Sequence, residues 1–116
     1  MMNSHDIRPF IPVNNLNASK VFYEALGFES DDTNDEMIII SNDTCSFFLY
    51  QAADIEGETN LMFQLIVPDI QAALNSIQNV QNTEVKYEPI KEAHWGKIIY
   101  LWGPSGEMWH ITELAT

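Results

Sequence analysis

The stretch IPVNNLNASKVFYEALGF, residues 11–28, contains the pattern that decides the fold: a short apolar strand followed at once by an amphipathic helix. Apolar residues alternate with others around its start, which predicts a strand over Arg8–Asn14. Pro9 and Pro12 lie within that strand and lack the backbone N–H that a central strand must donate. We therefore expect this strand at a sheet edge or beside a bulge.

The helix that follows has a recognisable beginning, buried face and end. Asn17 is interpreted as its N-cap, because a short polar side chain can accept a hydrogen bond from the first turn. Gly27 is expected just after the last turn, where glycine adopts a positive φ without strain. The apolar residues that fall on one helical face are Val21, Phe22, Ala25 and Leu26.

The same pattern recurs about half a chain length later. Leu61–Val67 predicts a second apolar strand, and Asp69 is interpreted as the N-cap of a second helix. The apolar face of that helix comprises Ile70, Ala73, Leu74 and Ile77. At a constant offset, the two copies match Val13 with Val67, Asn15 with Asp69, Leu16 with Ile70, and Ala18 with Ala72. This regularity predicts an internal repeat.

Three strand-like segments follow each helix. In the first half they are Phe28–Asp31, Glu36–Ser41 and Cys45–Gln51, with a tight turn at Asn42-Asp43. In the second half they are Thr83–Pro89, Gly96–Trp102 and Glu107–Thr112, with a hairpin turn at Gly103–Gly106. Each half is therefore predicted to be βαβββ. Because half a sheet with one helix cannot bury its own apolar face well, the two halves should pair.

These elements predict an α+β fold that occupies residues 1–116 as a single domain. Module one spans about residues 7–52, module two spans about residues 60–114, and the acidic segment Ala52–Thr59 links them. With 116 residues and 46% hydrophobic content, the chain can form one core of ordinary size.

The charge balance excludes some partners. Seventeen acidic residues against five basic ones give a formal charge of −12, and the basic residues are scattered singly. Nucleic acids and anionic membrane surfaces need a basic footprint, so neither is expected as a partner. The acidity would attract a cationic ligand, and it would equally serve solubility.

The remaining composition points to the cytoplasm as the expected location. The single cysteine, Cys45, rules out an internal disulfide framework and is expected to be a small buried hydrophobe. No apolar stretch approaches membrane length, and the first residues lack the pattern of a signal peptide.

Three segments carry a family pattern when they are taken together. FYEALGF (22–28) matches an FYxxLGF box, Phe63–Ile70 matches the start of a second module, and GPSGEMWHI (103–111) matches a DPxGNxxE hairpin, with Gly103 where Asp is usual. In this order they resemble the vicinal-oxygen-chelate superfamily of glyoxalases, bleomycin-resistance proteins and extradiol dioxygenases. The resemblance implies two βαβββ modules that form a curved eight-stranded mixed sheet around a cup.

Many members of that superfamily bind a divalent metal in the cup through four side chains. The resemblance places these positions on Arg8, Met62, Phe48 (or Tyr50 if the register differs by two) and His110. A guanidinium, a thioether and an aromatic ring cannot replace the oxygen and imidazole ligands that such a metal requires. We therefore expect neither a metal nor another cofactor. Without the metal, the Lewis-acid chemistry of the superfamily has no support here.

Seven residues are predicted to bind a ligand in the cup: Phe48, Tyr50, Met62, Tyr100, Trp102, His110 and Arg8. Alternate side chains of a strand face opposite sides, so Tyr100 and Trp102 share a face, whereas Trp109 belongs to the core if His110 faces the cup. Plainer alternatives stay open: Trp102 in the core, His110 as a structural histidine, and Arg8 in an ion pair with one of the surplus acids.

The missing metal ligands point to the bleomycin-resistance proteins, the metal-free branch of the superfamily. Trp95–Gly106 resembles their tryptophan–glycine strand and hairpin, and a histidine at the position of His110 also occurs there. The predicted function is binding, without turnover, of a cationic or aromatic antibiotic-like molecule by a homodimer whose cup combines both chains. No catalytic residue is assigned, because no Cys–His pair or GxSxG motif is present.

Two alternative functions remain open at this stage. The first is a metal-dependent glyoxalase-like lyase or dioxygenase with an atypical ligand set. The second is a structural or regulatory interaction module. Metal analysis and small-molecule thermal-shift screening distinguish them from the binding hypothesis.

Overall fold

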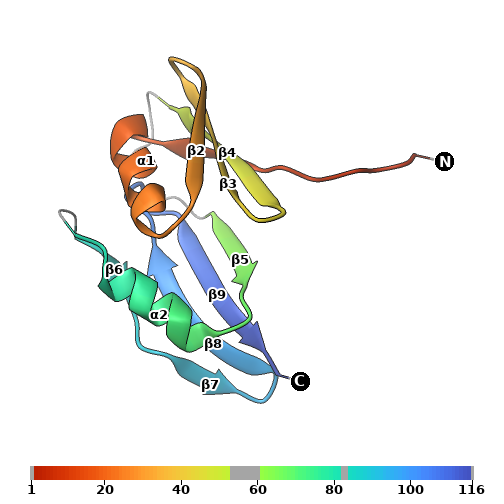
Figure 1. Cartoon of the computed structure of the whole chain (residues 1–116), viewed down its shortest axis with the longest axis vertical. Coiled ribbons are helices and arrows are strands. Elements are labelled where there is room, and N and C mark those ends of the chain that lie inside the picture. Colours follow the sequence, from red (N-terminus) through yellow and green to blue (C-terminus); the bar gives the residue numbers. More distant parts are fainter. Residues whose placement is uncertain (1, 53–60, 82–83, 116) are drawn as a thin grey trace.

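The computed structural model describes residues 2–52, 61–81 and 84–115, folded as two modules that each combine one helix with one sheet (Figure 1). Module one consists of β1 (Phe10–Val13), α1 (Leu16–Ala25), β2 (Glu29–Asn34), β3 (Met37–Asn42) and β4 (Cys45–Gln51). Module two consists of β5 (Met62–Ile66), α2 (Ile70–Gln78), β6 (Lys86–Tyr87), β7 (Lys91–Ala93), β8 (Gly96–Trp102) and β9 (Met108–Leu114). The predicted repeat is confirmed, because α1 and α2 begin at the matched residues Leu16 and Ile70.

The sheet of module one has the strand order β1-β4-β3-β2. β1 pairs in parallel with β4 and lies at the sheet edge, as Pro9 and Pro12 predicted. The other neighbours pair antiparallel. The β3–β4 turn is formed by Asp43 and Thr44, one residue later than predicted, because Asn42 still pairs with Cys45. Asp43 adopts a φ of 53° there.

The sheet of module two has the order β5-β9-β8-β6, and β7 also pairs with β8. The prediction of one strand over Thr83–Pro89 is wrong: β6 and β7 are two short strands on either side of Pro89. Glu88 still donates its backbone N–H to the Tyr100 carbonyl at 2.9 Å, but Pro89 has no N–H to continue the pairing. Thr83 itself lies outside the described residues.

Both helices begin at equivalent capping residues. The Asp69 side chain accepts hydrogen bonds from the first turn of α2, as predicted. In α1 the cap is Asn15, whose Oδ1 accepts from the backbone N–H of Ala18 at 3.0 Å, so the assignment of Asn17 is wrong. The reason is that Asn15 has the extended backbone of a cap, whereas Asn17 already lies inside the helix. Gly27 follows α1 with a φ of 107°, as expected.

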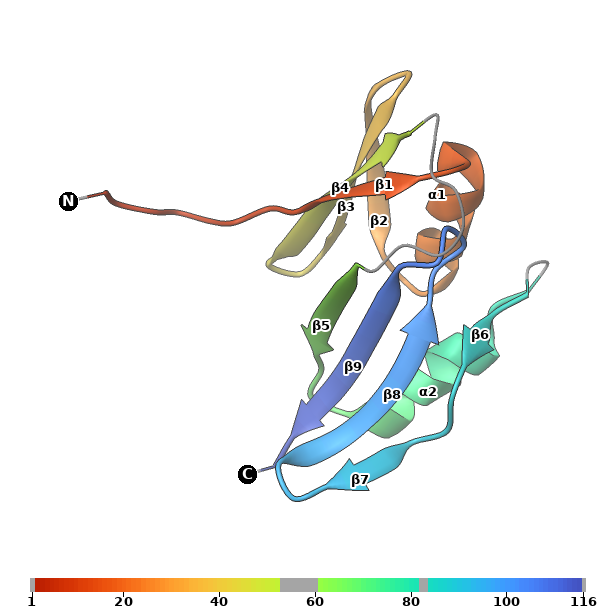
Figure 2. The ribbon, with the colours of Figure 1, turned by 180° about the vertical axis from the view of Figure 1, so that it is seen from behind.

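The helices cover one side of both sheets, and the view from behind shows the opposite sheet faces uncovered (Figures 1 and 2). The buried apolar side chains form one cluster that draws on both modules. Phe47 of module one and Trp109 of module two meet in it, with ring centroids 5.2 Å apart. The predicted place of Trp109 in the core is therefore confirmed. Cys45 is exposed rather than buried, because it begins β4 directly after the turn.

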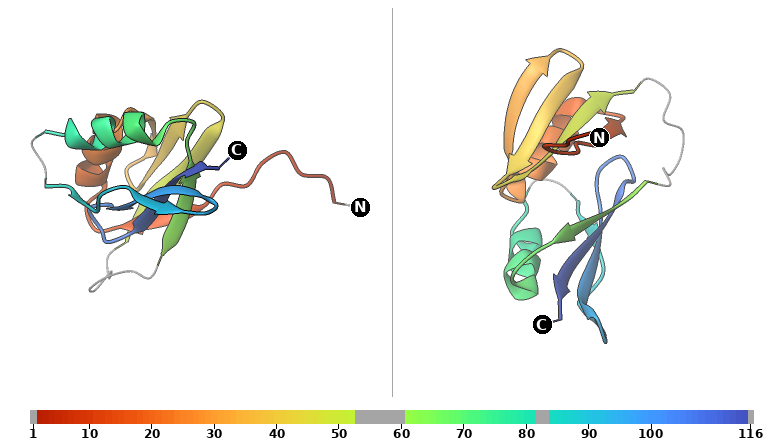
Figure 3. Two further views of the ribbon diagram at one scale, coloured as in Figure 1. Left: turned by 90° about the horizontal axis from the view of Figure 1, so that it is seen from below. Right: turned by 90° about the vertical axis from the view of Figure 1, so that its right-hand side faces the viewer.

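Instead of one curved sheet of eight strands, the described residues form a four-stranded and a five-stranded sheet. The first strand of each module pairs with the last strand of the same module, so the two sheets meet through side chains. Seen from below, both helices lie on the same side of the sheets (Figure 3). The linking segment Ala52–Thr59, apart from Ala52, lies outside the described residues. No helix in the described part of the chain is long and apolar enough to cross a membrane.

Candidate functional site

The uncovered face of module two, called here the cup face, presents three rows of side chains. Residues that lie opposite each other on paired strands share a face of the sheet. The rows are Trp102–Met108–Met62, Tyr100–His110–Gln64 and Ile98–Thr112–Ile66. Four of the predicted ligand-binding residues therefore lie together on this face: Met62, Tyr100, Trp102 and His110.

Two lysines from the edge strands lie over aromatic rings of the cup face. Lys86 places its Nζ 4.5 Å from the ring centroid of Trp102, and Lys91 places its Nζ 4.7 Å from that of Tyr100. Both distances suit a cation–π interaction. Lys91 also forms an ion pair with Glu88 at 2.7 Å, and this hydrogen bond raises the pKa of Lys91. The cup face thus combines aromatic surface with positive charge.

His110 offers an unused hydrogen-bonding atom in the middle row of the cup face. Its ring meets Tyr100 edge to face, with centroids 4.9 Å apart. Its Nε2 is buried and has no hydrogen-bond partner among the described residues. No described carboxylate orients the ring, although a general base is normally held by such a partner. Without such a partner, the geometry gives no support to proton abstraction by His110.

The uncovered face of module one is also aromatic. Phe10 and Phe48 lie opposite each other on β1 and β4, and their rings stack with centroids 4.4 Å apart and planes inclined by 10°. Tyr50 lies on the same face, 6.5 Å from Phe10 between centroids. Sequence reasoning identified Phe48 and Tyr50 but missed Phe10. Alternation could have indicated it, because Phe10 follows the predicted cup residue Arg8 at a spacing of two.

Arg8 lies on the extended segment before β1, where it lines a hollow with Asp6 and with Ile39, Ser41 and Ser46 of the β3–β4 hairpin. The N-terminal part of this segment runs away from the two modules (Figures 1 and 2). Its Nε donates to Oδ2 of Asp6 at 3.1 Å, and both side chains are about half exposed. This hydrogen bond lowers the pKa of Asp6. The position favours the ion-pair interpretation of Arg8 over a ligand clamp.

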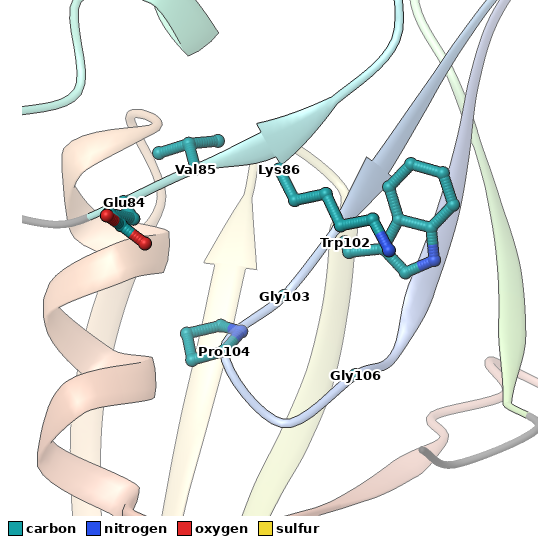
Figure 4. Close-up of a pocket in the computed structure, with 7 residues that line it drawn as sticks. All are labelled: Glu84, Val85, Lys86, Trp102, Gly103, Pro104 and Gly106. Carbon is teal, nitrogen blue, oxygen red and sulfur yellow. The ribbon is translucent and has the colours of Figure 1, made fainter.

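The single chain does not gather the seven predicted residues into one pocket. Tyr50 lines a hollow of about 450 Å³ with Phe10 and Met37. Trp102 lines another hollow of about 500 Å³ between β6 and the β8–β9 hairpin, called here the Trp102 hollow (Figure 4). Its walls are Glu84, Val85, Lys86, Trp102, Gly103, Pro104 and Gly106. The predicted cup is present as two open sheet faces on the side away from the helices.

A buried hydrogen-bond network holds the hairpin beside the Trp102 hollow. Tyr23 donates its hydroxyl to Oε2 of Glu107 at 2.8 Å, and Nε1 of Trp109 donates to the Tyr23 hydroxyl at 2.9 Å. The backbone N–H of Ser105 donates to Oε1 of Glu107 at 3.0 Å. The Glu107 carboxylate packs against Gly103, where an added Cβ would lie 2.5 Å from either oxygen. The network joins the helix of module one to the hairpin of module two.

Burial governs the protonation of this network. Glu107 is fully buried, and burial raises the pKa of its carboxyl although the hydrogen bonds from Tyr23 and Ser105 lower it. Burial also raises the pKa of Tyr23 well above its ordinary value, and the nearby Glu107 carboxylate adds to this effect. Tyr23 therefore stays protonated and remains a hydrogen-bond donor throughout the ordinary pH range.

The side chains at the expected metal positions do not fit a divalent cation. Arg8, Met62, Phe48 and His110 supply one imidazole between them, and Arg8 is engaged by Asp6. Within residues 2–52, 61–81 and 84–115, no group of three or more His, Cys, Asp or Glu side chains could hold a metal ion. No chemical step through a metal follows from these residues.

Comparison with known proteins gives matches in structure rather than in sequence. No protein-family model matches the chain, and no curated protein matches it. The bleomycin-binding protein from bleomycin-producing Streptomyces verticillus, complexed with copper(II)-bleomycin, is 17% identical and superposes with a TM-score of 0.82 over 99% of this chain and 100% of that chain. TnmS3, an antibiotic-binding protein from Streptomyces sp. CB03234, is 18% identical with a TM-score of 0.78 over 99% of this chain and 100% of that chain.

A further similar structure is that of the genomically encoded fosfomycin resistance protein FosX from Listeria monocytogenes, complexed with Mn(II) and a sulfate ion. It is 12% identical, with a TM-score of 0.77 over 98% of this chain and 93% of that chain. At these identities the likeness establishes the fold. The chain therefore has the glyoxalase/bleomycin-resistance fold, which confirms the two βαβββ modules that the sequence resemblance implied, here with one mixed sheet in each module.

Proposed function

We propose that this chain, which has the glyoxalase/bleomycin-resistance fold, binds a small aromatic antibiotic-like molecule and does not turn it over. The observation that carries the proposal is the uncovered cup face, where the rings of Tyr100 and Trp102 lie in neighbouring rows and His110 lies opposite Tyr100. Open aromatic rings next to a few polar atoms are typical of small-molecule sites. Structures of the same fold include a bleomycin-binding protein and an antibiotic-binding protein, which supports this ligand class.

Binding without turnover follows from what the cup side chains can supply. They offer stacking surface, the amide of Gln64 and the imidazole of His110, without a paired acid and base. The alternative lyase or dioxygenase activity requires metal ligands that Arg8, Met62 and Phe48 cannot provide.

Replacement of Trp102 tests the binding proposal. Bleomycin and planar aromatic compounds are titrated by calorimetry, so that removal of a tryptophan does not remove the signal. For a compound that binds the wild type, Trp102→Ala should weaken binding about tenfold, because a stacking side chain is lost. Trp95→Ala is the matched control, since exposed Trp95 lies outside the cup face. Absence of saturable binding by any compound, or an equal loss in Trp95→Ala, would contradict the proposal.

The uncovered faces of both modules also support the proposal of a homodimer. Apolar side chains on the side away from the helices are strongly exposed, among them Phe10 (53%), Met62 (64%) and Ile66 (57%). Such a concentration of exposed apolar surface is typical of an interface or a ligand site. A second copy would cover part of this surface and combine the two open faces into a deeper cup.

Sedimentation equilibrium tests the dimer. The wild type is expected to sediment at twice the 13.3 kDa of one chain. Ile66→Asp should shift the mass toward one chain, because a buried unpaired carboxylate opposes association. Val21→Asp is the control, since Val21 is exposed to a similar degree (46%) on helix α1 at the opposite side. A wild type that stays at 13.3 kDa at every concentration would overturn the dimer.

A further inference from the structure

We propose that the Trp102 hollow selects an aromatic ligand that carries a negative group, with Lys86 as the residue that recognises the charge. This inference rests on the proposed binding function and specifies the charge of a ligand that stacks on Trp102, the residue that the cup face and the hollow share. It reverses the expectation that the acidic composition of the chain raises, namely a cationic ligand.

The first observation is the position of Lys86. It lies on edge strand β6 opposite Trp102, and its Nζ is 4.5 Å from the centroid of the indole ring. No ion pair engages Lys86 among the described residues. An ammonium group has three N–H donors, so the contact with one ring face leaves donors for an anion in the hollow. A carboxylate, sulfonate or phosphate on a ring that stacks at Trp102 would reach them.

The second observation is the distribution of the other charges around the hollow. Glu84 is the acidic side chain among its lining residues, and its carboxylate lies at the opposite end of the hollow from the Lys86 ammonium (Figure 4). Lys91, over Tyr100 in the next row, adds a second positive charge that Glu88 partly compensates. The charge at the Trp102 end of the hollow is therefore positive.

Local charge outweighs the net charge of the chain at this distance. The formal charge of −12 comes from 17 acidic residues spread along the sequence. At physiological ionic strength the Debye length is about 8 Å, so exposed charges beyond that distance are largely screened. A ligand that stacks on Trp102 would lie within a few ångströms of Lys86, whose charge it experiences most directly.

The test uses three probes that share one ring and differ in charge: 1-naphthoate, 1-naphthalenemethanol and 1-naphthylmethylammonium. Binding to the full-length wild type is measured by calorimetry at physiological salt. Naphthoate is expected to bind at least about fivefold more tightly than the ammonium probe, with the neutral probe between them. Equal affinities, or tightest binding of the cation, would overturn the inference while leaving the proposed binding function intact. Absence of saturable binding by all three probes would overturn the inference, and the proposed binding function would fall with it only if bleomycin and the other planar compounds also failed to bind.

Variants assign the preference to Lys86. Lys86→Gln should abolish most of the difference between naphthoate and the ammonium probe, whereas Lys86→Arg should retain it because the positive charge remains. Lys97→Gln is the matched control: it changes the net charge equally, but Lys97 alternates with the cup residues of β8 and points to the other side of the sheet. A preference that survives in Lys86→Gln, or that is lost equally in Lys97→Gln, would overturn the role of Lys86.

Discussion

Gly103→Ala is expected to lower the free energy of unfolding by about 3 kcal/mol, through displacement of a buried carboxylate. The added Cβ would lie 2.5 Å from both oxygens of Glu107, which is fully buried and bonded to Tyr23 and Ser105. A flexible, exposed glutamate side chain could move to another rotamer, but the Glu107 carboxylate has to break two hydrogen bonds before it can move. For a chain of this size the melting temperature should fall by about 10 °C, measurable by calorimetry or by urea unfolding.

Two further variants separate this steric effect from other consequences of adding a methyl group. In a Glu107→Ala background the carboxylate is absent, so Gly103→Ala should cost less than about 1 kcal/mol there. Gly27→Ala is the control for backbone strain, because Gly27 has a φ of 107° but nothing within 4 Å of an added Cβ; it should cost about 1 kcal/mol. An equal cost of Gly103→Ala in both backgrounds would show that Glu107 is not the obstacle.

The Gly103–Glu107 contact explains a departure that was visible in the sequence without its reason. The closing hairpin resembles DPxGNxxE, but Gly103 stands where Asp is usual. In the structure, the Glu107 carboxylate packs against the Cα of Gly103 in space that a side chain at 103 would need. The absence of a side chain at 103 therefore leaves room for the buried Glu107 carboxylate, a relation that only the three-dimensional contact reveals.

The helices and the internal repeat were predictable because the pattern of apolar residues that defines them lies within short stretches of sequence. Helix faces repeat every three to four residues and the two copies match at a constant offset, so α1, α2 and the repeat could be recognised from the residues themselves. The misplaced cap shows the limit of such reasoning. Asn15 and Asn17 are both good capping residues, and the matched pair Asn15 and Asp69 was the better guide.

Features that depend on pairing between strands were not predictable to the same degree. Alternation within β8 placed Tyr100 and Trp102 on one face, and the structure agrees. Lys86 was missed because only the β6–β8 register brings it opposite Trp102. The net charge gave an impression of a uniformly acidic surface, although two of the five basic residues lie over aromatic rings of the cup face.

Tyr23→Phe is the second substitution expected to have a large effect. It removes the hydroxyl that lies between Glu107 and Trp109, which leaves the indole N–H of Trp109 unpartnered and the carboxyl with one donor fewer. We expect a loss of about 2–4 kcal/mol in the free energy of unfolding. Tyr87→Phe is the control, because the half-buried Tyr87 makes no hydrogen bond through its hydroxyl to the described residues; it should change stability by less than about 0.5 kcal/mol.

The cost of Tyr23→Phe should also depend on pH, in a direction that the pKa of Glu107 fixes. Burial raises the pKa of Glu107, so the folded state binds the proton more tightly than the unfolded state does. The stability that comes from this proton is fully present at acid pH and is lost as the pH rises through the folded pKa. The Tyr23 hydrogen bond lowers the pKa, so its removal raises the folded pKa further and extends the loss to higher pH. Urea unfolding of wild type and variant should therefore give the smallest difference at the most acid pH at which both fold, and a larger one at neutral pH. A difference that is constant with pH, or largest in acid, would mean that Glu107 does not titrate within this network.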